Sequence, residues 1–295
     1  MKPVAFDYVR PSSVSEACGL LAADDGARVI AGGQTLIPML AMRLARPTRL
    51  VDISRIADLA FIRDDADAVT IGAVTRQCVA ERDPIVATQL PLLAKALPWV
   101  GHPPTRHRGT IGGSIANGDP AAEIPLVAVT LQASISVQDA SSQATKIPAT
   151  EFYLGPMITA LPEGGLVTEI RFPVWTQGRI GAGFHEVSAR RSDFAFVASA
   201  AQVALDADGR CTALSVGLGG AGDTPVRLDR VSDALVGSRL DEAAVRAAVA
   251  AATEDLETVD DLHASAAYRR RVAATLARRA ILDARDEAAG GRHAR

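Results

Sequence analysis

The chain has few cysteines and no long basic run, and each scarcity excludes a class of protein. Among 295 residues the only cysteines are Cys18, Cys78 and Cys211, which are far apart. No paired spacing that could hold zinc or an iron–sulfur cluster occurs, so we expect all three to be inert packing residues and any such cluster to lie on another chain. A formal charge of -3 without a basic run argues against nucleic acid and anionic membranes as partners.

Long hydrophobic runs are also missing. No apolar stretch reaches the roughly 18 residues of a spanning helix, and residues 1–7 lack the apolar core of a signal peptide. We therefore expect no membrane insertion and a cytoplasmic location. The composition, 48% hydrophobic and 22% charged, is ordinary for a globular protein, and the length is sufficient for two domains.

Two glycine pairs each stand beside an apolar run that predicts a strand. They are Ala31-Gly32-Gly33-Gln34-Thr35 and Thr110-Ile111-Gly112-Gly113-Ser114. Without a Cβ, glycine lets the backbone approach a phosphate and turn its N–H groups inward, and the neighbouring hydroxyls add donors. We interpret the pairs as loops on the two sides of one cofactor cleft. From the residues alone, a turn that merely needs positive φ is an equal alternative for the first pair.

The hydrophobic periodicity predicts an α/β region followed by strands and then helices. The first part contains a helix over 14–23 opened by Ser12 or Ser13, and a helix over 120–131 with Asp119 as N-cap and Pro120 at its first position. The remaining predicted helices span 36–44, 242–252 and 267–287, with others from about residues 76 and 91; the predicted strands span 28–31, 50–53, 69–73, 134–138, 166–172, 183–188, 195–205 and 211–218.

One formal match to a dinucleotide fingerprint is rejected. Residues 217–222 read G-x-G-x-x-G after a strand-like run, but Pro225 follows and would break the helix that the fingerprint requires. We interpret this stretch as a tight interdomain or hairpin loop.

The two glycine segments resemble a known pair of signatures when longer stretches are compared. These stretches are Ala31-Gly-Gly-Gln-Thr-Leu-Ile-Pro-Met-Leu and Arg108-Gly-Thr-Ile-Gly-Gly-Ser-Ile-Ala-Asn-Gly-Asp-Pro-Ala-Ala-Glu-Ile-Pro. They are similar to those of the FAD-carrying medium subunit of the molybdenum hydroxylases. That family includes carbon monoxide dehydrogenase and the nicotine- and caffeine-type dehydrogenases, and is homologous to the flavin domain of xanthine dehydrogenase. The resemblance extends in order from Phe6-Asp-Tyr-Val-Arg-Pro to His263-Ala-Ser-Ala-Ala-Tyr-Arg-Arg.

The resemblance implies an α+β fold with two domains. Residues 1–175 would form an FAD-binding domain of p-cresol methylhydroxylase type, with subdomains of about 1–56 and 57–175. Residues 176–290 would form a smaller C-terminal α+β domain, an antiparallel sheet plus helices.

The resemblance also implies a set of FAD contacts. Glu123 falls on an acidic contact to a ribose or adenine group, and a histidine replaces the family's lysine at position 185. Phe194, in the loop Arg190-Arg-Ser-Asp-Phe, falls where an aromatic ring covers the isoalloxazine. A helix cap for Asp119, a structural role for His185 and a simple charged turn for the loop are the alternatives. Together the implied cofactor-binding residues are Ile30, Ala31, Gly32, Gly33, Gln34, Thr35, Val100, Gly109, Thr110, Ile111, Gly112, Gly113, Ser114, Asp119, Glu123, His185, Asp193 and Phe194.

Arg106 is expected to brace the loop before the second pair rather than contact FAD. The basic stretch 268–271 is open between a solvated helix face and a docking surface. No catalytic residue or metal site is predicted, because no triad, metal cluster or carboxylate pair has usable spacing.

The function implied is electron transfer through noncovalent FAD in a heterotrimer. A small subunit with two [2Fe–2S] clusters would supply electrons, and a large subunit with the molybdopterin cofactor would oxidise the substrate. The expected assembly is a dimer of heterotrimers. Two alternatives remain: a self-contained FAD oxidase or reductase, and a flavin-free scaffold subunit. Substrate and electron acceptor are not specified by this sequence.

Overall fold

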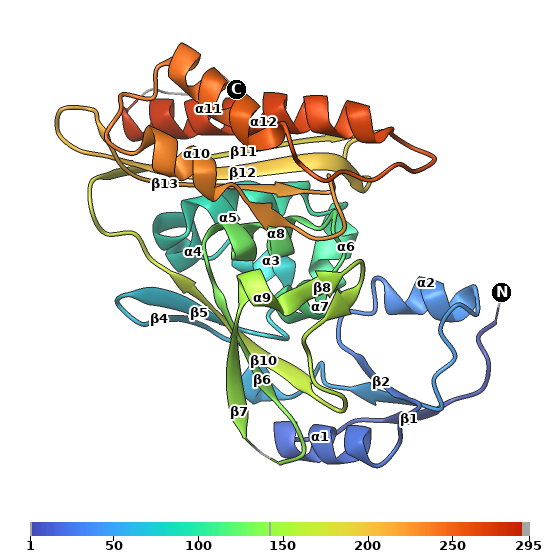
Figure 1. Cartoon of the computed structure of the whole chain (residues 1–295). Helices are drawn as coiled ribbons and strands as arrows, with labels where there is room; N and C mark the ends of the chain where they lie inside the picture. Colours follow the sequence, from blue (N-terminus) through green and yellow to red (C-terminus); the bar gives the residue numbers. More distant parts are fainter. Residues whose placement is uncertain (1, 142, 291–295) are drawn as a thin grey trace.

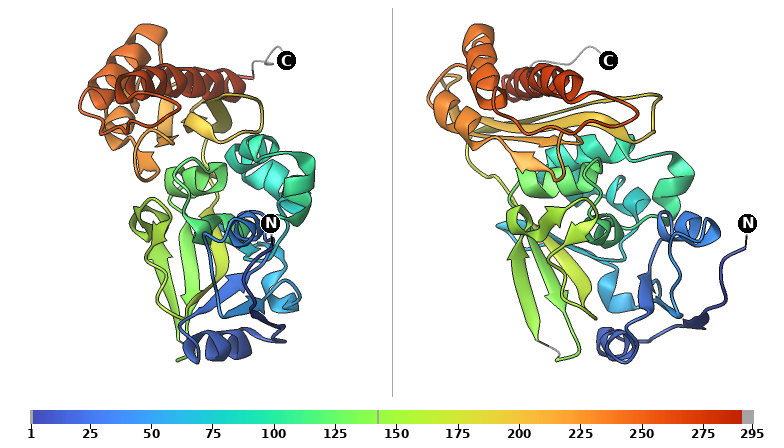
Figure 2. Two further views of the ribbon diagram at one scale, coloured as in Figure 1. Left: turned by 90° about the vertical axis from the view of Figure 1, so that its right-hand side faces the viewer. Right: turned by 45° about the vertical axis from the view of Figure 1, so that its right-hand side comes forward.

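The computed structural model describes residues 2–141 and 143–290, and its elements are stacked in layers (Figure 1). Three helices cover a four-stranded sheet, which lies on a layer of short helices above a five-stranded sheet. A small lobe with the N-terminus lies to one side, and the turned views show the same order (Figure 2).

The helices are α1 (Val14–Ala22), α2 (Leu36–Ala41), α3 (Gln77–Ala80), α4 (Pro84–Gln89), α5 (Pro91–Ala96), α6 (Pro103–Arg108), α7 (Ile111–Asn117), α8 (Glu123–Thr130), α9 (Ala149–Phe152), α10 (Asp229–Leu235), α11 (Glu242–Thr253) and α12 (Ala266–Ala288), with short 3-10 helices η1 (Ala57–Leu59) and η2 (Leu97–Trp99). The strands are β1 (Asp7–Val9), β2 (Ala27–Ile30), β3 (Arg49–Asp52), β4 (Ile62–Asp64), β5 (Ala68–Gly72), β6 (Ser134–Gln138), β7 (Ala144–Pro148), β8 (Tyr153–Gly155), β9 (Ile158–Thr159), β10 (Leu166–Pro173), β11 (Arg179–Ser188), β12 (Ala195–Leu205), β13 (Cys211–Gly219) and β14 (Val226–Arg227).

The N-terminal lobe is a parallel three-stranded sheet with order β1-β3-β2 and helix α1 packed against it. Ser13 caps α1, its hydroxyl accepting a hydrogen bond from the Glu16 amide at 3.1 Å, so the predicted helix start is confirmed. Because the strands are parallel, their carboxyl ends lie at one edge of the sheet. The first glycine pair follows β2 at that edge, as the sequence predicts.

The second part of the N-terminal region is an antiparallel sheet with order β4-β5-β10-β6-β7. Its buried side chains and the helices α4, α5, α7 and α8 form one large apolar cluster. Sequence periodicity predicts the central strands β5, β6 and β10. It misses the edge strand β7, whose residues are mostly exposed and carry no buried face.

The C-terminal region is the antiparallel sheet β11-β12-β13-β14, confirming the predicted sheet-plus-helix architecture. Helix α12 approaches β11 closely, because a Cβ at Gly181 or Gly183 would lie 2.1 or 2.0 Å from a carbonyl oxygen of that helix. The opposite face packs on the short helices: the rings of Phe184 and Trp99 have centroids 6.1 Å apart. The two regions therefore share a core. The predicted boundary falls in the connection 174–178 between β10 and β11.

Three local predictions need correction. Helix α8 begins at Glu123 and not at Pro120, because Asp119 Oδ1 accepts a hydrogen bond from the Ala121 amide at 2.9 Å and forms a turn instead of a helix cap. The second glycine pair is the first turn of helix α7 and not a loop. Arg269, in the basic stretch, is buried and donates to the Gly220 carbonyl at 2.7 Å, so it belongs to neither a solvated face nor a docking surface.

Candidate cofactor cleft

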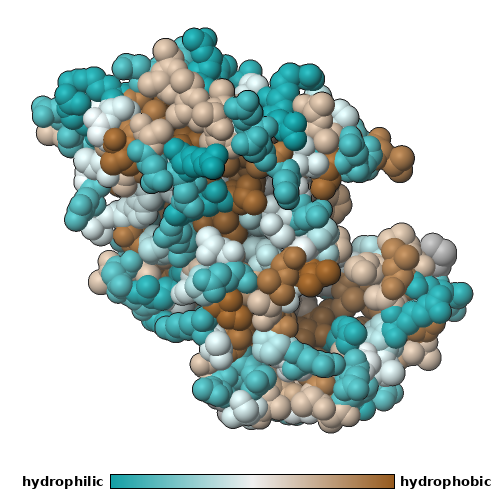
Figure 3. All heavy atoms as spheres, viewed as in Figure 1, coloured by the Kyte–Doolittle hydropathy of each residue, from teal (hydrophilic) through white to brown (hydrophobic). Residues whose placement is uncertain are grey.

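A cleft of about 860 Å³ lies where the N-terminal lobe, the short helices and the β11–β12 loop meet. Figure 3 shows the surface hollowed between the N-terminal lobe and the rest of the molecule, with apolar atoms on both sides. Most of the residues predicted to bind the cofactor line it: Ile30, Ala31, Gly32, Gly33, Gln34, Thr35, Val100, Gly109, Thr110, Gly113, Ser114, Asp119, Glu123, Asp193 and Phe194. Ile111, Gly112 and His185 do not.

The two glycine segments touch at Gly32. A Cβ on this residue would lie 2.4 Å from the Arg108 carbonyl oxygen and 2.8 Å from the Gly109 Cα, so only glycine allows this approach. The next residue, Gly33, has φ +70, which a larger side chain rarely adopts. The predicted pairing of the two segments at one cleft is therefore present in the fold.

The first glycine turn offers free backbone donors. Within the described part of the chain, no acceptor receives a hydrogen bond from the amides of residues 32–35. Gly32 and Gly33 are half-buried, where backbone amides are usually paired, and Gln34 and Thr35 are exposed. The turn therefore leaves four amides open to an external acceptor, two of them in a position where a partner is expected. An anionic ligand with several oxygens, such as a diphosphate, satisfies such a run.

The second glycine pair differs from the prediction, because its amides are used inside the protein. The Ile111 amide donates to the Thr75 carbonyl at 3.0 Å and the Gly112 amide to the Ala73 carbonyl at 2.9 Å. The Gly113 amide donates to the Thr110 hydroxyl at 3.0 Å. What this segment presents to the cleft is bare backbone at Gly113 and the hydroxyl groups of Thr110 and Ser114.

Arg106 braces the segment that leads to the second pair, as predicted. Its guanidinium forms two bonds with Glu81, at 2.8 and 3.0 Å, and donates to the carbonyls of Val100 and Gly101 at 3.2 and 2.9 Å. The side chain is buried, so it shapes the loop without reaching the cleft.

Two carboxylates, Asp119 and Glu123, line the cleft, and the Glu186 carboxylate lies close enough to Glu123 for the charge of Glu123 to act on it. Burial raises the pKa of Glu123 to about 7; the charge of Asp119 adds to this rise and that of Arg106 opposes it. Burial, followed by the charge of Glu123, raises the pKa of Glu186 to about 8. Burial also raises the pKa of Asp119. Near neutral pH Glu123 binds a proton readily, so the part of the cleft around Glu123 suits hydroxyl and amine groups better than phosphate oxygens.

The loop between β11 and β12 carries an exposed aromatic ring to the cleft. Phe194 is 75% exposed, which excludes a core role. Asp193 and Arg190 hold the loop by an ion pair of 2.9 Å, and this contact lowers the pKa of Asp193, with a smaller contribution from His102 across the cleft. Ser192 adopts φ +71 at the bend.

His185 is not among the residues that line the cleft, and the FAD contact expected there stays a prediction. It shares a strand face with Gly181 and Gly183, which is the face toward α12, and its Nε2 lies 2.8 Å from the Asp283 Oδ2. The adjacent Glu186 points to the other side. Strand alternation places residues 184 and 186 on one face.

Other lining residues carry no motif. Residues 161–165 form a turn between β9 and β10, and His102 and Asn117 contribute polar groups. The glycines and the proline of residues 161–165 predict a turn but not its position. That this turn lies at the cleft follows from the tertiary fold alone.

The described residues contain neither a candidate membrane span nor a candidate metal site. Within residues 2–141 and 143–290, no helix has the length and apolarity needed to cross a membrane. In the same ranges, no three His, Cys, Asp or Glu side chains are grouped to hold a metal ion. Cys18 and Cys211 are buried free thiols, and burial raises the pKa of both.

Comparison with known proteins covers nearly the whole chain. Residues 4–175 match the FAD binding domain in molybdopterin dehydrogenase, and residues 182–284 match the CO dehydrogenase flavoprotein C-terminal domain. The 6-hydroxypseudooxynicotine dehydrogenase complex subunit alpha of Paenarthrobacter nicotinovorans is 39% identical over 285 residues, which is 96% of each chain. The carbon monoxide dehydrogenase medium chain of Afipia carboxidovorans is 36% identical, over 95% of this chain and 97% of that one. The crystal structure of quinoline 2-oxidoreductase from Pseudomonas putida 86 superposes with a TM-score of 0.92 at 36% identity, over 98% of this chain and 99% of that one.

Proposed function

The chain belongs to the flavoprotein family of the molybdenum hydroxylases, and from this premise we propose that it transfers electrons through noncovalently bound FAD in a complex of three kinds of subunit. A small [2Fe–2S] subunit would deliver the electrons, and a large molybdenum subunit would oxidise the substrate. Two such heterotrimers would form the complete assembly. The observation that carries the proposal is the run of four unpaired amides in a cleft shared by both glycine segments.

The residues of the cleft suit the parts of FAD in a defined order. The amides of residues 32–35 and the hydroxyls of Thr110 and Ser114 would hold the diphosphate, since charge-assisted hydrogen bonds are worth about 1.5–3 kcal/mol each. Glu123 would bind a ribose hydroxyl or an adenine amine, because its raised pKa fits a neutral partner. Phe194 would cover one face of the isoalloxazine.

The bound cofactor supplies the redox chemistry, and the protein supplies position and environment. Gly32 keeps the two segments in contact, and Arg106 keeps the loop before Gly109 in place. The Phe194 ring would exclude water from the flavin face that it covers.

The test is Gly32→Ala, with Gly19→Ala as its matched control. The added methyl at Gly32 would collide with the Arg108 carbonyl, whereas a Cβ at Gly19 meets nothing within 4 Å. We expect Gly32→Ala to lose most of its FAD, measured as the flavin-to-protein ratio after purification, and Gly19→Ala to keep it. Full FAD in Gly32→Ala would show that the contact of the segments is irrelevant to cofactor binding.

The subunit assignment needs a separate experiment. The chain purified from its native source should bring molybdenum and iron with it, each assayed with flavin. Oxidation of an organic substrate by the isolated chain would favour a self-contained oxidase. A colourless, flavin-free chain in the native complex would favour the scaffold.

A further inference from the structure

A second pocket of about 880 Å³ borders the first glycine turn. It shares Ile30–Gln34 with the cleft but none of the second glycine pair. Its size is within the range of small-molecule sites. Its other walls include Tyr8, Arg10, Asp52, Arg55, Arg76 and Arg108.

The pocket lies at the carboxyl edge of the parallel sheet. Arg10 follows β1, the glycine turn follows β2, and Ser54 and Arg55 follow β3. In open α/β sheets, ligands bind in the crevice outside the carboxyl ends of the strands. The fold therefore places this pocket where such sheets carry ligands.

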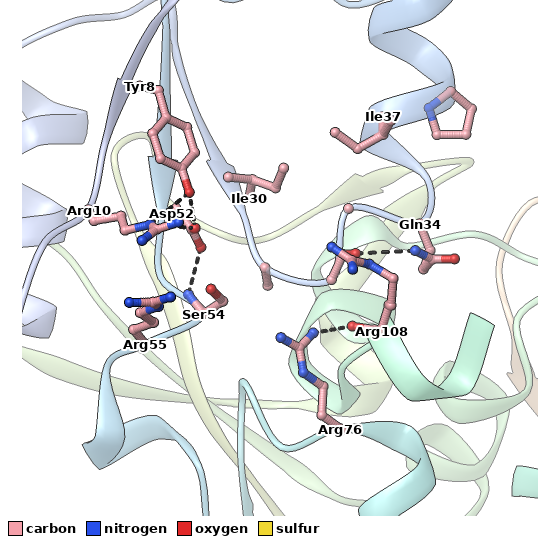
Figure 4. A pocket seen from close by; sticks show the side chains of 14 residues that line it. Tyr8, Arg10, Ile30, Gln34, Ile37, Asp52, Ser54, Arg55, Arg76 and Arg108 are labelled. Carbon is pink, nitrogen blue, oxygen red and sulfur yellow. Dashed lines mark hydrogen bonds and ion pairs between the residues drawn. The ribbon is translucent and has the colours of Figure 1, made fainter. Parts of the chain in front are cut away.

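Four arginines face this pocket. Figure 4 shows Arg10 and Arg55 on one side and Arg76 and Arg108 on the other, with Ile30 between them. Asp52 is the one acidic residue of the lining, so three positive charges are left in excess. Such a wall attracts a ligand with more than one negative charge.

Hydrogen bonds and ion pairs within the protein neutralise only part of the positive charge of the four arginines. Asp52 accepts from the Tyr8 hydroxyl and lies 3.4 Å from Arg10 Nε, so it neutralises only the Arg10 side. Arg76 donates to the Arg108 carbonyl. In the part of the chain that the structure describes, the guanidinium groups of Arg55 and Arg108 have no hydrogen-bond or ion-pair partner.

We propose that this pocket is a second anion site, separate from the FAD cleft, for a small molecule that carries a diphosphate. A diphosphate presents enough charge to balance the arginine excess, and guanidinium forks match phosphate oxygens in pairs. A monocarboxylate would leave most of the charge unbalanced. The four arginines line this pocket and not the FAD cleft, so the proposal does not depend on the proposed function.

The test is a calorimetric titration of the flavin-loaded full chain with inorganic pyrophosphate. We expect binding at one site, weaker binding of inorganic phosphate, and loss of affinity with added salt. Arg55→Gln/Arg108→Gln should bind pyrophosphate at least tenfold more weakly. Arg230→Gln/Arg246→Gln removes the same charge from exposed positions on α10 and α11 and should bind like the unchanged chain.

Three results would overturn the proposal. Absence of pyrophosphate binding to the unchanged chain is one, and equal affinity in the two double variants is another. The third is binding by the flavin-free chain that disappears when FAD is loaded, because the anion would then occupy the place of the cofactor's own diphosphate.

Discussion

Phe194 is an exposed aromatic side chain that buries little in the protein itself, so its truncation separates cofactor binding from folding. Phe194→Ala should leave the thermal unfolding of the flavin-free chain unchanged. It should weaken FAD binding about tenfold, since lost stacking and burial amount to about 1.4 kcal/mol. A fluorescence titration of the flavin-free chain with FAD measures this change.

Two variants serve as controls for Phe194→Ala. Phe194→Tyr keeps the ring and should bind FAD nearly as the unchanged chain does. Leu262→Ala truncates a fully exposed apolar side chain far along the sequence and should affect neither property. If Phe194→Ala binds FAD as tightly as Leu262→Ala, the ring does not lie on the flavin.

The carboxyl group of Glu186 gives the flavin-free chain a pH dependence. Its pKa is about 8 in the folded chain against an ordinary value of 4.5, so the folded state binds the proton more tightly than the unfolded state. The resulting stabilisation is complete below the unfolded pKa and is lost as the pH rises through the folded pKa. Thermal stability should therefore fall between about pH 5 and pH 8.

Glu186→Gln tests this source of instability. Both carboxylate oxygens of Glu186 are buried and have no hydrogen-bond partner within the described residues. The glutamine side chain cannot ionise, so the variant avoids placing an unpaired negative charge there. The variant should be more stable than the unchanged chain by at least about 1 kcal/mol at pH 8, with no gain at pH 5. Glu254→Gln, at an exposed position, should show no such difference between the two pH values. A gain of equal size at both would exclude titration of Glu186 as the cause.

The pair His185 and Glu186 shows where residue-level prediction stops. Because side chains alternate along β11, the two residues face opposite sides, but the sequence does not tell which side meets α12 and which meets the short helices. The close packing of Gly181 and Gly183 against α12 decides it, and this contact joins segments about 100 residues apart.

Among the elements, α6 depends on a buried ion pair. Arg106→Ala would leave Glu81 without its partner and free two backbone carbonyls, so we expect a loss of about 3 kcal/mol in urea unfolding. The flavin-to-protein ratio should fall too, because α6 leads directly into Gly109. Arg278→Ala breaks an exposed ion pair with Glu242 and should cost at most about 1 kcal/mol. Similar losses in the two variants would mean that the Arg106 brace contributes no more than a surface contact.

Prediction of elements succeeded where buried periodicity or caps were strong. The range of β12 and the Ser13 cap of α1 follow from local sequence. Helix α7 does not, because Gly112 and Gly113 disfavour a helix; its first amides are instead held by carbonyls of residues 73 and 75, which lie far back in the chain. Asp119-Pro120 has a strong cap pattern, yet Gly118 at φ +62 ends one helix immediately before it and leaves a turn.

For the whole molecule, the order of regions was predictable from the family signatures, but the shared core was not. The short helices pack against both the five-stranded and the four-stranded sheet, as the cluster that joins Trp99 to Phe184 shows. The N-terminal lobe has a smaller core of its own. It meets the other regions around the cleft, so a ligand there contacts all of them at once.

Bound FAD should therefore stabilise the contact between the lobe and the rest of the molecule. The thermal midpoint should rise with FAD concentration without reaching a plateau at one equivalent, since a ligand at 100 times its Kd adds about 2.7 kcal/mol to stability. Limited proteolysis should cut the flavin-free chain faster near the lobe, and FAD should suppress that cut. An unchanged thermal midpoint with FAD present would contradict this stabilisation.

The attachment of FAD is the last prediction. Because the cleft offers hydrogen bonds and no residue that we assign to a covalent link, acid precipitation should release all flavin to the supernatant. Colour that stays in the pellet would contradict noncovalent binding.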